Sequence, residues 1–180
     1  MKLKHIIGGI AVAAIAAAGI KLSSHRAGPD NIYPQIPGKT NPNVTQANIQ
    51  DTICKSGWTA TIRPPASYTT ALKIQQLKQY GNQDQAPKDY EEDHFISLEL
   101  GGDPKDPQNL WPEPYFTPDT SQGARSKDRV ENYLNTQVCA GNISLQEAQK
   151  EITTDWYQIY AKVYGGTLGA SPQSNDPDDE

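Results

Sequence analysis

Apolar residues near the end of the chain recur at steps of three and four positions, which places them along one face of a helix. Ser144 precedes this run and Glu147 follows three positions later, which is the spacing of a capping box, and Gly165 comes after the run, where a helix commonly ends. The pattern predicts a long amphipathic helix whose apolar stripe belongs to the core. The stripe consists of Leu145, Ala148, Ile152, Trp156, Ile159 and Val163.

Two further helices and several short strands are predicted upstream. Residues 67–80 form a helical segment that Ser67 can cap and Gly81 can end, and residues 124–138 form a second one. Residues 52–54 and 58–62 have the composition of short strands around a Lys-Ser-Gly turn. We therefore expect a mixed α+β domain in which helices flank a small sheet.

The central stretch, residues 90–110, combines ionisable and apolar groups. Apolar and polar residues alternate over 95–100, which is the period of a half-buried strand. Two glycines and a proline then break the chain at 101–104. Asn109 follows His94 by fifteen positions, so a turn can return it to the histidine.

His94 is the candidate catalytic group of this stretch, and three acids precede it directly. Histidine can take up a proton near neutral pH, an adjacent carboxylate can hold a metal, and an amide can orient an imidazole. The same residue types also suit a structural histidine beside a solvated acidic face. Neighbouring residues of a regular strand point to opposite faces. Asp93 and His94 can therefore share one site only if the strand begins or bulges there.

The order Asp-His, apolar strand, Gly-Gly, Asn-Leu resembles the HNH endonuclease family of the ββα-metal class. The wider span from residue 52 to 160 is also similar to small bacterial HNH-like proteins, through "ICKSGWTATIRPPASYT", "YEEDHFISLELGG", "NLWPEP" and "KDRVENYLN". The resemblance implies a single α+β domain with a ββα-metal core. In that core, a β-hairpin of residues 95–100 and the Asn109 region packs on the helix at 124–138.

The resemblance also implies a metal-dependent endonuclease that hydrolyses phosphodiester bonds in DNA or RNA. His94 is then the general base that activates water, and Asn109 holds the imidazole. Asp93 and one helix residue bind a single divalent ion, Mg²⁺, Mn²⁺ or Zn²⁺. No histidine follows His94 in this chain, so the helix ligand is one of Asp128, Glu131 and Asn132.

Two cationic residues are candidate substrate contacts, although both have plainer explanations. Arg63 can contact a phosphate or form an ordinary surface ion pair. Lys127 can do the same, or it can pair with Glu131 four positions along a solvent-facing helix.

Charge limits the kind of nucleic-acid binding that is expected. The chain of 180 residues has 16 Lys and Arg against 21 Asp and Glu, a net charge of −5. A protein that grips many phosphates usually has a basic face, so broad electrostatic binding to a duplex is not expected. Two alternatives remain open. One is a non-catalytic extracytoplasmic domain that kept an HNH-like fold, and the other is a secreted hydrolase using paired carboxylates among Glu91, Glu92 and Glu113.

The N-terminal segment indicates export. Basic residues precede fifteen uncharged ones, so residues 1–22 are predicted to be a signal peptide or an N-terminal membrane anchor. Residues 23–50 are expected to be a linker, 51–166 the nuclease-like domain, and 167–180 a disordered acidic tail. Cys54 and Cys139 are the two cysteines, and in an exported chain they are expected to form a disulfide. No obligate protein partner is indicated.

Overall fold

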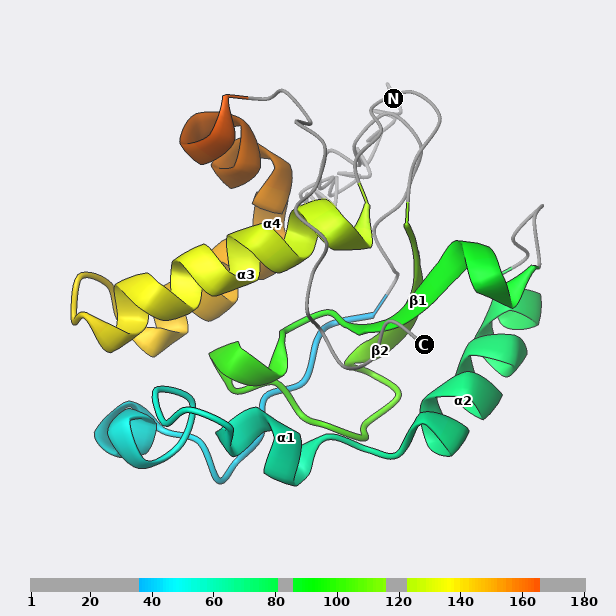
Figure 1. The fold of residues 1–180 in the computed structure, drawn as a ribbon, viewed down its shortest axis with the longest axis horizontal. Helices are drawn as coiled ribbons and strands as arrows, with labels where there is room; N and C mark the ends of the chain where they lie inside the picture. The colour runs from blue at the N-terminus through cyan, green and yellow to red at the C-terminus, as the bar shows by residue number, and fades with distance from the viewer. Residues whose placement is uncertain (1–35, 81–85, 116–122, 166–180) are drawn as a thin grey trace, which may run out of the picture.

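A computed structural model describes residues 36–80, 86–115 and 123–165. The predicted targeting segment and the acidic tail lie outside these ranges. The described chain is a mixed α+β structure with a two-stranded antiparallel sheet, β1 (Tyr90–His94) and β2 (Leu110–Pro114). In Figure 1 the sheet lies between α2 (Ala66–Gln79) on one side and the pair α3 (Ala124–Cys139) and α4 (Leu145–Tyr164) on the other.

The three predicted long helices are present, and their bounds agree with the sequence patterns within about two residues. The Ser144 hydroxyl accepts a hydrogen bond from the backbone N–H of Glu147 at 3.1 Å, which caps α4. Gly165 ends that helix with a left-handed φ of 78°, a conformation that glycine adopts without strain. The α4 stripe packs on α3, and the core around both helices includes Val130, Leu134, Val138, Ala148, Ile152, Trp156 and Tyr160.

The strand predictions were wrong in three places. Residues 58–62 form a short helix, α1 (Trp58–Ile62), and residues 52–54 lie in turns after the 3-10 helix η1 (Gln46–Asp51). No strand forms at 95–100. The strand of this region, β1, ends at His94, and the 3-10 helix η3 (Leu98–Leu100) follows it.

The alternation over 95–100 misled because nearly every side chain there is buried, apolar and polar alike. Phe95, Ile96, Ser97, Leu98 and Leu100 are between 0% and 6% exposed. The segment is therefore an irregular turn enclosed by the core, and its backbone groups are satisfied by side chains and turn bonds in place of a neighbouring strand.

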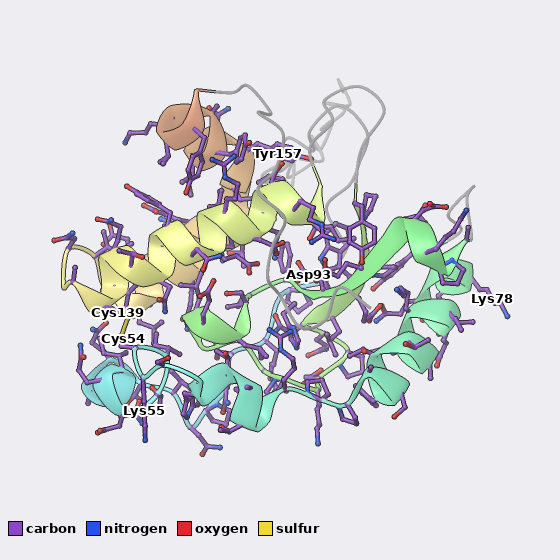
Figure 2. The ribbon with its side chains drawn as sticks, in the orientation of Figure 1. Cys54, Lys55, Lys78, Asp93, Cys139 and Tyr157 are labelled. Carbon is purple, nitrogen blue, oxygen red and sulfur yellow. A yellow bond between two sulfur atoms is a disulfide. The ribbon has the colours of Figure 1, made fainter. Side chains whose placement is uncertain are left out.

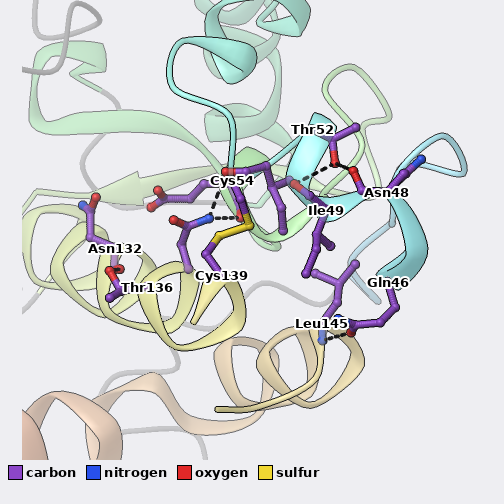
Figure 3. Close-up of a disulfide and its surroundings, with 12 residues drawn as sticks. Gln46, Asn48, Ile49, Thr52, Cys54, Asn132, Thr136, Cys139 and Leu145 are labelled. Atoms are coloured by element: carbon purple, nitrogen blue, oxygen red, sulfur yellow. Dashed lines mark hydrogen bonds between the residues drawn. A yellow bond between two sulfur atoms is a disulfide. The ribbon is translucent and has the colours of Figure 1, made fainter. Parts of the chain in front are cut away.

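Part of the segment expected to be a linker belongs to the fold. Val44 and Ile49 are each 7% exposed and pack in the main core. The Gln46 side chain accepts a hydrogen bond from the backbone N–H of Leu145 at 2.7 Å (Figure 3). Residues 40–50 are therefore part of the fold, held by these two apolar side chains and by hydrogen bonds to other segments.

The predicted disulfide between Cys54 and Cys139 is confirmed, with the two Cα atoms 5.6 Å apart. Figure 3 shows it joining the turn after η1 to the C-terminal end of α3. The Asn135 side chain supports the same junction by donating to the Ile53 and Glu99 carbonyls at 3.2 and 2.8 Å. A disulfide is consistent with an oxidising compartment outside the cytoplasm. Among the described helices, none has the length and apolar content needed to span a bilayer.

Replacing both cysteines by serine is expected to lower the free energy of unfolding by roughly 4 kcal/mol, because the bond closes a loop of 85 residues. Urea unfolding followed by circular dichroism measures this loss. Reduction of the wild-type protein should reproduce it. Equal stability of the oxidised wild type and the double variant would show that the bond adds nothing.

Candidate functional site

A buried lysine crosses from α3 to the sheet at the centre of the molecule. Lys127 is 0% exposed, and its Nζ donates to Asp93 Oδ2 at 2.5 Å, to the His94 carbonyl at 2.9 Å and to the Glu131 carboxylate. Glu113 Oε2 lies 3.9 Å from the same nitrogen. Figure 2 shows Asp93 in the space between α3 and the sheet. One ammonium therefore links β1, β2 and α3.

The charges of this cluster are balanced largely within it. Burial opposes the charged form of Lys127, but Asp93, Glu131 and Glu113 together raise the pKa of the lysine well above its usual value. Burial would also raise the pKa of Asp93, and the ammonium reverses this so that the pKa of Asp93 is lowered. Burial raises the pKa of Glu113 well above its usual value and that of Glu131 to about 7. Lys127 and Asp93 are thus the fixed ion pair of the cluster.

His94 lies on the opposite face of β1 from Asp93, as the alternation of a regular strand requires. Its Nε2 is 3.1 Å from the Pro104 carbonyl oxygen. A carbonyl only accepts, so this bond requires the hydrogen on Nε2 and leaves the lone pair on Nδ1. Burial lowers the pKa of His94 to about 4, helped by the charges of Arg63 and Lys127 and opposed by Asp93 and by the Pro104 bond. The ring is therefore neutral at pH 7 and its Nδ1 can accept a proton.

Asn109 positions the histidine through the backbone and makes no hydrogen bond to the ring. Its Oδ1 accepts from the Ile96 N–H at 2.9 Å, and its Nδ2 donates to the Ile96 carbonyl at 2.9 Å and to the Asp103 carbonyl at 3.0 Å. The last bond fixes the residue directly before Pro104, the partner of the His94 ring. Asn109 therefore holds the β1–β2 connection in shape, and the connection holds the imidazole.

Gly102 allows this close packing. A Cβ at that position would lie 1.7 Å from the Ile96 carbonyl oxygen and 2.7 Å from Asn109 Nδ2. Any larger residue would displace the amide that closes the connection. The second glycine of the Gly-Gly pair thus allows the Ile96 backbone and the Asn109 side chain to approach closely.

A cavity of about 410 Å³ runs along β1 beside α2. Histidine, cationic and acidic side chains line it together, and β1 is hydrogen-bonded to a strand on one side only. The lining has one more cationic than acidic residue, whereas the chain as a whole has a net charge of −5. The cationic lining residues are Arg63, Lys73, Lys88 and Arg125, and the acidic ones are Glu91, Glu92 and Asp93.

Glu92 is a site residue that the sequence analysis considered only as one of several possible paired carboxylates. It shares a face of β1 with His94 because the two are two positions apart. Both carboxyl oxygens are shielded from water, and neither finds a hydrogen-bond partner within the ranges that the structure covers. Burial raises the pKa of Glu92 to about 8, opposed by Lys73. At neutral pH this group is a carboxylic acid that can donate to a ligand oxygen. The sequence feature that could have identified Glu92 is its spacing of two positions from His94, which places both on one face of a strand.

The residues predicted to hold a metal do not form one donor set. Asn132 is exposed and its amide donates to the Asp128 carbonyl at 2.8 Å. Asp128 is half-buried, and burial with the nearby Glu131 raises its pKa to about 9. Asp93 and Glu131 do converge, but on the Lys127 ammonium. Among residues 36–80, 86–115 and 123–165, no three His, Cys, Asp or Glu side chains form a group that could hold a metal ion.

The two predicted substrate contacts have different positions. Arg63 lines the cavity that contains His94. Lys127 is enclosed by carboxylates and has no exposed surface, so it cannot touch a substrate in this structure. The i,i+4 pair of Lys127 with Glu131 exists as the helical spacing suggested, but in the interior and not on a solvent face. The additional carboxylate from β1 compensates the cost of burying the lysine.

No protein-family model, curated protein or solved structure matched this chain. The resemblance to HNH endonucleases therefore rests on the motif residues themselves.

Proposed function

We propose that this protein is an endonuclease that hydrolyses phosphodiester bonds in DNA or RNA, with His94 as the general base. The observation that carries the proposal is the state and place of His94. Its ring is neutral at pH 7, its Nε2 is held by Pro104, and it lines a cavity with four cationic side chains. A base of this kind needs an unprotonated nitrogen within reach of the attacking water.

In the proposed reaction, His94 Nδ1 takes a proton from water as the water oxygen attacks phosphorus. The P–O bond to the leaving group breaks, which yields a phosphomonoester and an alcohol. Arg63, Lys73 and Arg125 line the cavity from different elements and can offset the negative charge on the phosphoryl oxygens. Protonated Glu92, on the same strand face as His94, can supply a proton to the leaving oxygen.

No step in this reaction passes through a divalent cation. The carboxylates that the sequence suggested for a metal, Asp93 and Glu131, are occupied by Lys127. The same pairing would suit the alternative of a non-catalytic domain with an HNH-like fold, since Asp93 and Glu131 contact Lys127 in place of an ion. The position of His94 at the cavity supports the catalytic proposal, and an oligonucleotide cleavage assay distinguishes it from the non-catalytic one.

The cavity suits a short stretch of nucleic acid. Its volume of about 410 Å³ is in the usual range for small-ligand sites, and Tyr115 in its lining can stack on a base. The cationic lining is local, so few phosphates are engaged. We therefore also propose a weak dependence of binding on salt compared with proteins that contact many phosphates.

We further propose that the protein acts outside the cytoplasm, attached to the membrane or released from it. The basic and uncharged N-terminal segment and the disulfide support this. Fusing residues 1–30 to a reporter that is active only outside the cytoplasm tests it, and an expressed but silent fusion would count against export.

End-labelled DNA and RNA oligonucleotides, incubated with the full oxidised chain, test the nuclease proposal. Shorter labelled products should accumulate in proportion to enzyme, with Mg²⁺, Mn²⁺ or Zn²⁺ and also in EDTA. Cleavage that needs added metal would place a cation in the reaction at another position. A folded protein that cuts neither substrate under any of these conditions would leave the non-catalytic alternative.

A further inference from the structure

The Lys127 nitrogen lies where oxygen atoms converge from three elements. Asp93 Oδ2 and the His94 carbonyl come from β1, Glu131 from the next turn of α3, and Glu113 Oε2 approaches to 3.9 Å from β2. Carboxylate and carbonyl oxygens gathered around one point are the surroundings that hard cations such as Ca²⁺, Mg²⁺ and Mn²⁺ select in proteins. Here the cation at that point is an ammonium.

The ammonium donates to three of these oxygens and has no N–H left for a ligand, whereas Glu113 Oε2 has no hydrogen-bond partner in the part of the chain that the structure describes. A lysine has three N–H donors, and the three closest acceptors use all of them. Lys127 is fully enclosed, so it can neither bind a phosphate nor be replaced easily by a solvated ion. A second cation brought to the same oxygens would meet the fixed positive charge at a few ångströms, where repulsion is strong away from water.

We propose that the Lys127 ammonium is the permanent cation of this oxygen cluster and closes it to divalent metals. The cluster is then a cation site whose occupant is covalently part of the chain. It ties β1, β2 and α3 together, which is the mechanical task that a bound metal ion would otherwise perform. The inference concerns cation binding alone and holds whether or not the chain cleaves nucleic acid.

Two substitutions of Lys127 are expected to differ in their binding of divalent cations. Lys127→Ala removes the ammonium and most of the side-chain volume, and it leaves the carboxylates of Asp93 and Glu131 and the His94 carbonyl facing an empty space. That space should accept a divalent cation. Lys127→Met also removes the charge but fills the space with an apolar side chain of similar length, so it serves as the matched control.

Binding of Mn²⁺ to the oxidised full chain, measured by the loss of the free-ion paramagnetic resonance signal, tests the proposal. Lys127→Ala should bind one Mn²⁺ per chain at least about tenfold more tightly than the wild type or Lys127→Met, and Mn²⁺ should raise its melting temperature. If Lys127→Ala is unfolded without metal, Mn²⁺ or Ca²⁺ should restore its helical circular dichroism, since metal binding to such a site is coupled to folding.

Binding of Mn²⁺ by the wild-type protein is one of two results that would contradict the proposal. One Mn²⁺ bound per wild-type chain, with binding abolished by Asp93→Asn, would overturn the proposal because the ion would share the cluster with the ammonium. A Lys127→Ala protein that neither binds Mn²⁺ nor responds to it would also overturn it, because the oxygens would then not form a cation site. Weak wild-type binding that Asp93→Asn leaves unchanged, together with a Lys127→Ala site, supports it.

Discussion

Replacing His94 by alanine is expected to lower the rate of oligonucleotide cleavage by about 10²–10⁴-fold, the usual contribution of a positioned general base. His94 is the only histidine within the part of the chain that the structure describes. No other imidazole there can take over the proton transfer. Single-turnover rates with saturating enzyme measure the effect on chemistry apart from binding.

Two comparisons separate the role of His94 from a loss of structure. Lys78→Ala, an exposed position on α2 (Figure 2), should cleave at the wild-type rate. Asn109→Ala should lose less activity than His94→Ala, because Asn109 acts on the ring only through the β1–β2 connection. A His94→Ala protein with native circular dichroism and an undiminished rate would remove His94 from the mechanism.

Replacing Lys127 by methionine is expected to lower the free energy of unfolding by about 3–5 kcal/mol, the usual cost of removing one partner of a buried ion pair. Methionine keeps most of the side-chain volume, so the loss comes from charge and hydrogen bonding and not from a cavity. Asp93 and Glu131 would be left buried without a cation, and the His94 carbonyl without its donor.

Urea unfolding of the oxidised protein measures this change, with Lys78→Met as the surface control. The midpoint should fall for Lys127→Met and stay unchanged for the control. Equal midpoints for the two variants would show that the ammonium is not an essential link between α3 and the sheet.

The long helices could be predicted because their evidence is local. Residues 145–164 show an apolar stripe, a capping serine and a terminal glycine in the sequence itself. The strand prediction failed because alternation over 95–100 does not distinguish a half-buried strand from a turn enclosed by the core. Tyr90–His94, the actual strand, contains three consecutive acids, which β-strand composition disfavours. Its place is set by pairing with β2 and by contacts with α2 and α3.

The candidate site was predictable only in part, because some of its features depend on tertiary contacts that the sequence does not show locally. His94 and Asn109 were identifiable from residue type and spacing, and the structure places both at the β1–β2 connection. Lys127 was not identifiable as a buried residue, because an i,i+4 pair with Glu131 looks the same in sequence on a surface helix and in an interior. Only the arrival of Asp93 and Glu113 from the sheet makes burial of the ammonium tolerable.

The pH dependence of single-turnover cleavage tests the central claim most directly. A general base must be unprotonated, so the rate falls as the pH drops through the pKa of that base. Burial lowers the pKa of His94 to about 4 from an ordinary value of 6.5. The rate should therefore hold constant from pH 7 down to about 5 and fall with a midpoint near pH 4, with circular dichroism confirming that the protein stays folded. A midpoint near pH 6.5, or a rate independent of pH over this range, would contradict the assignment of His94 as a buried, neutral base.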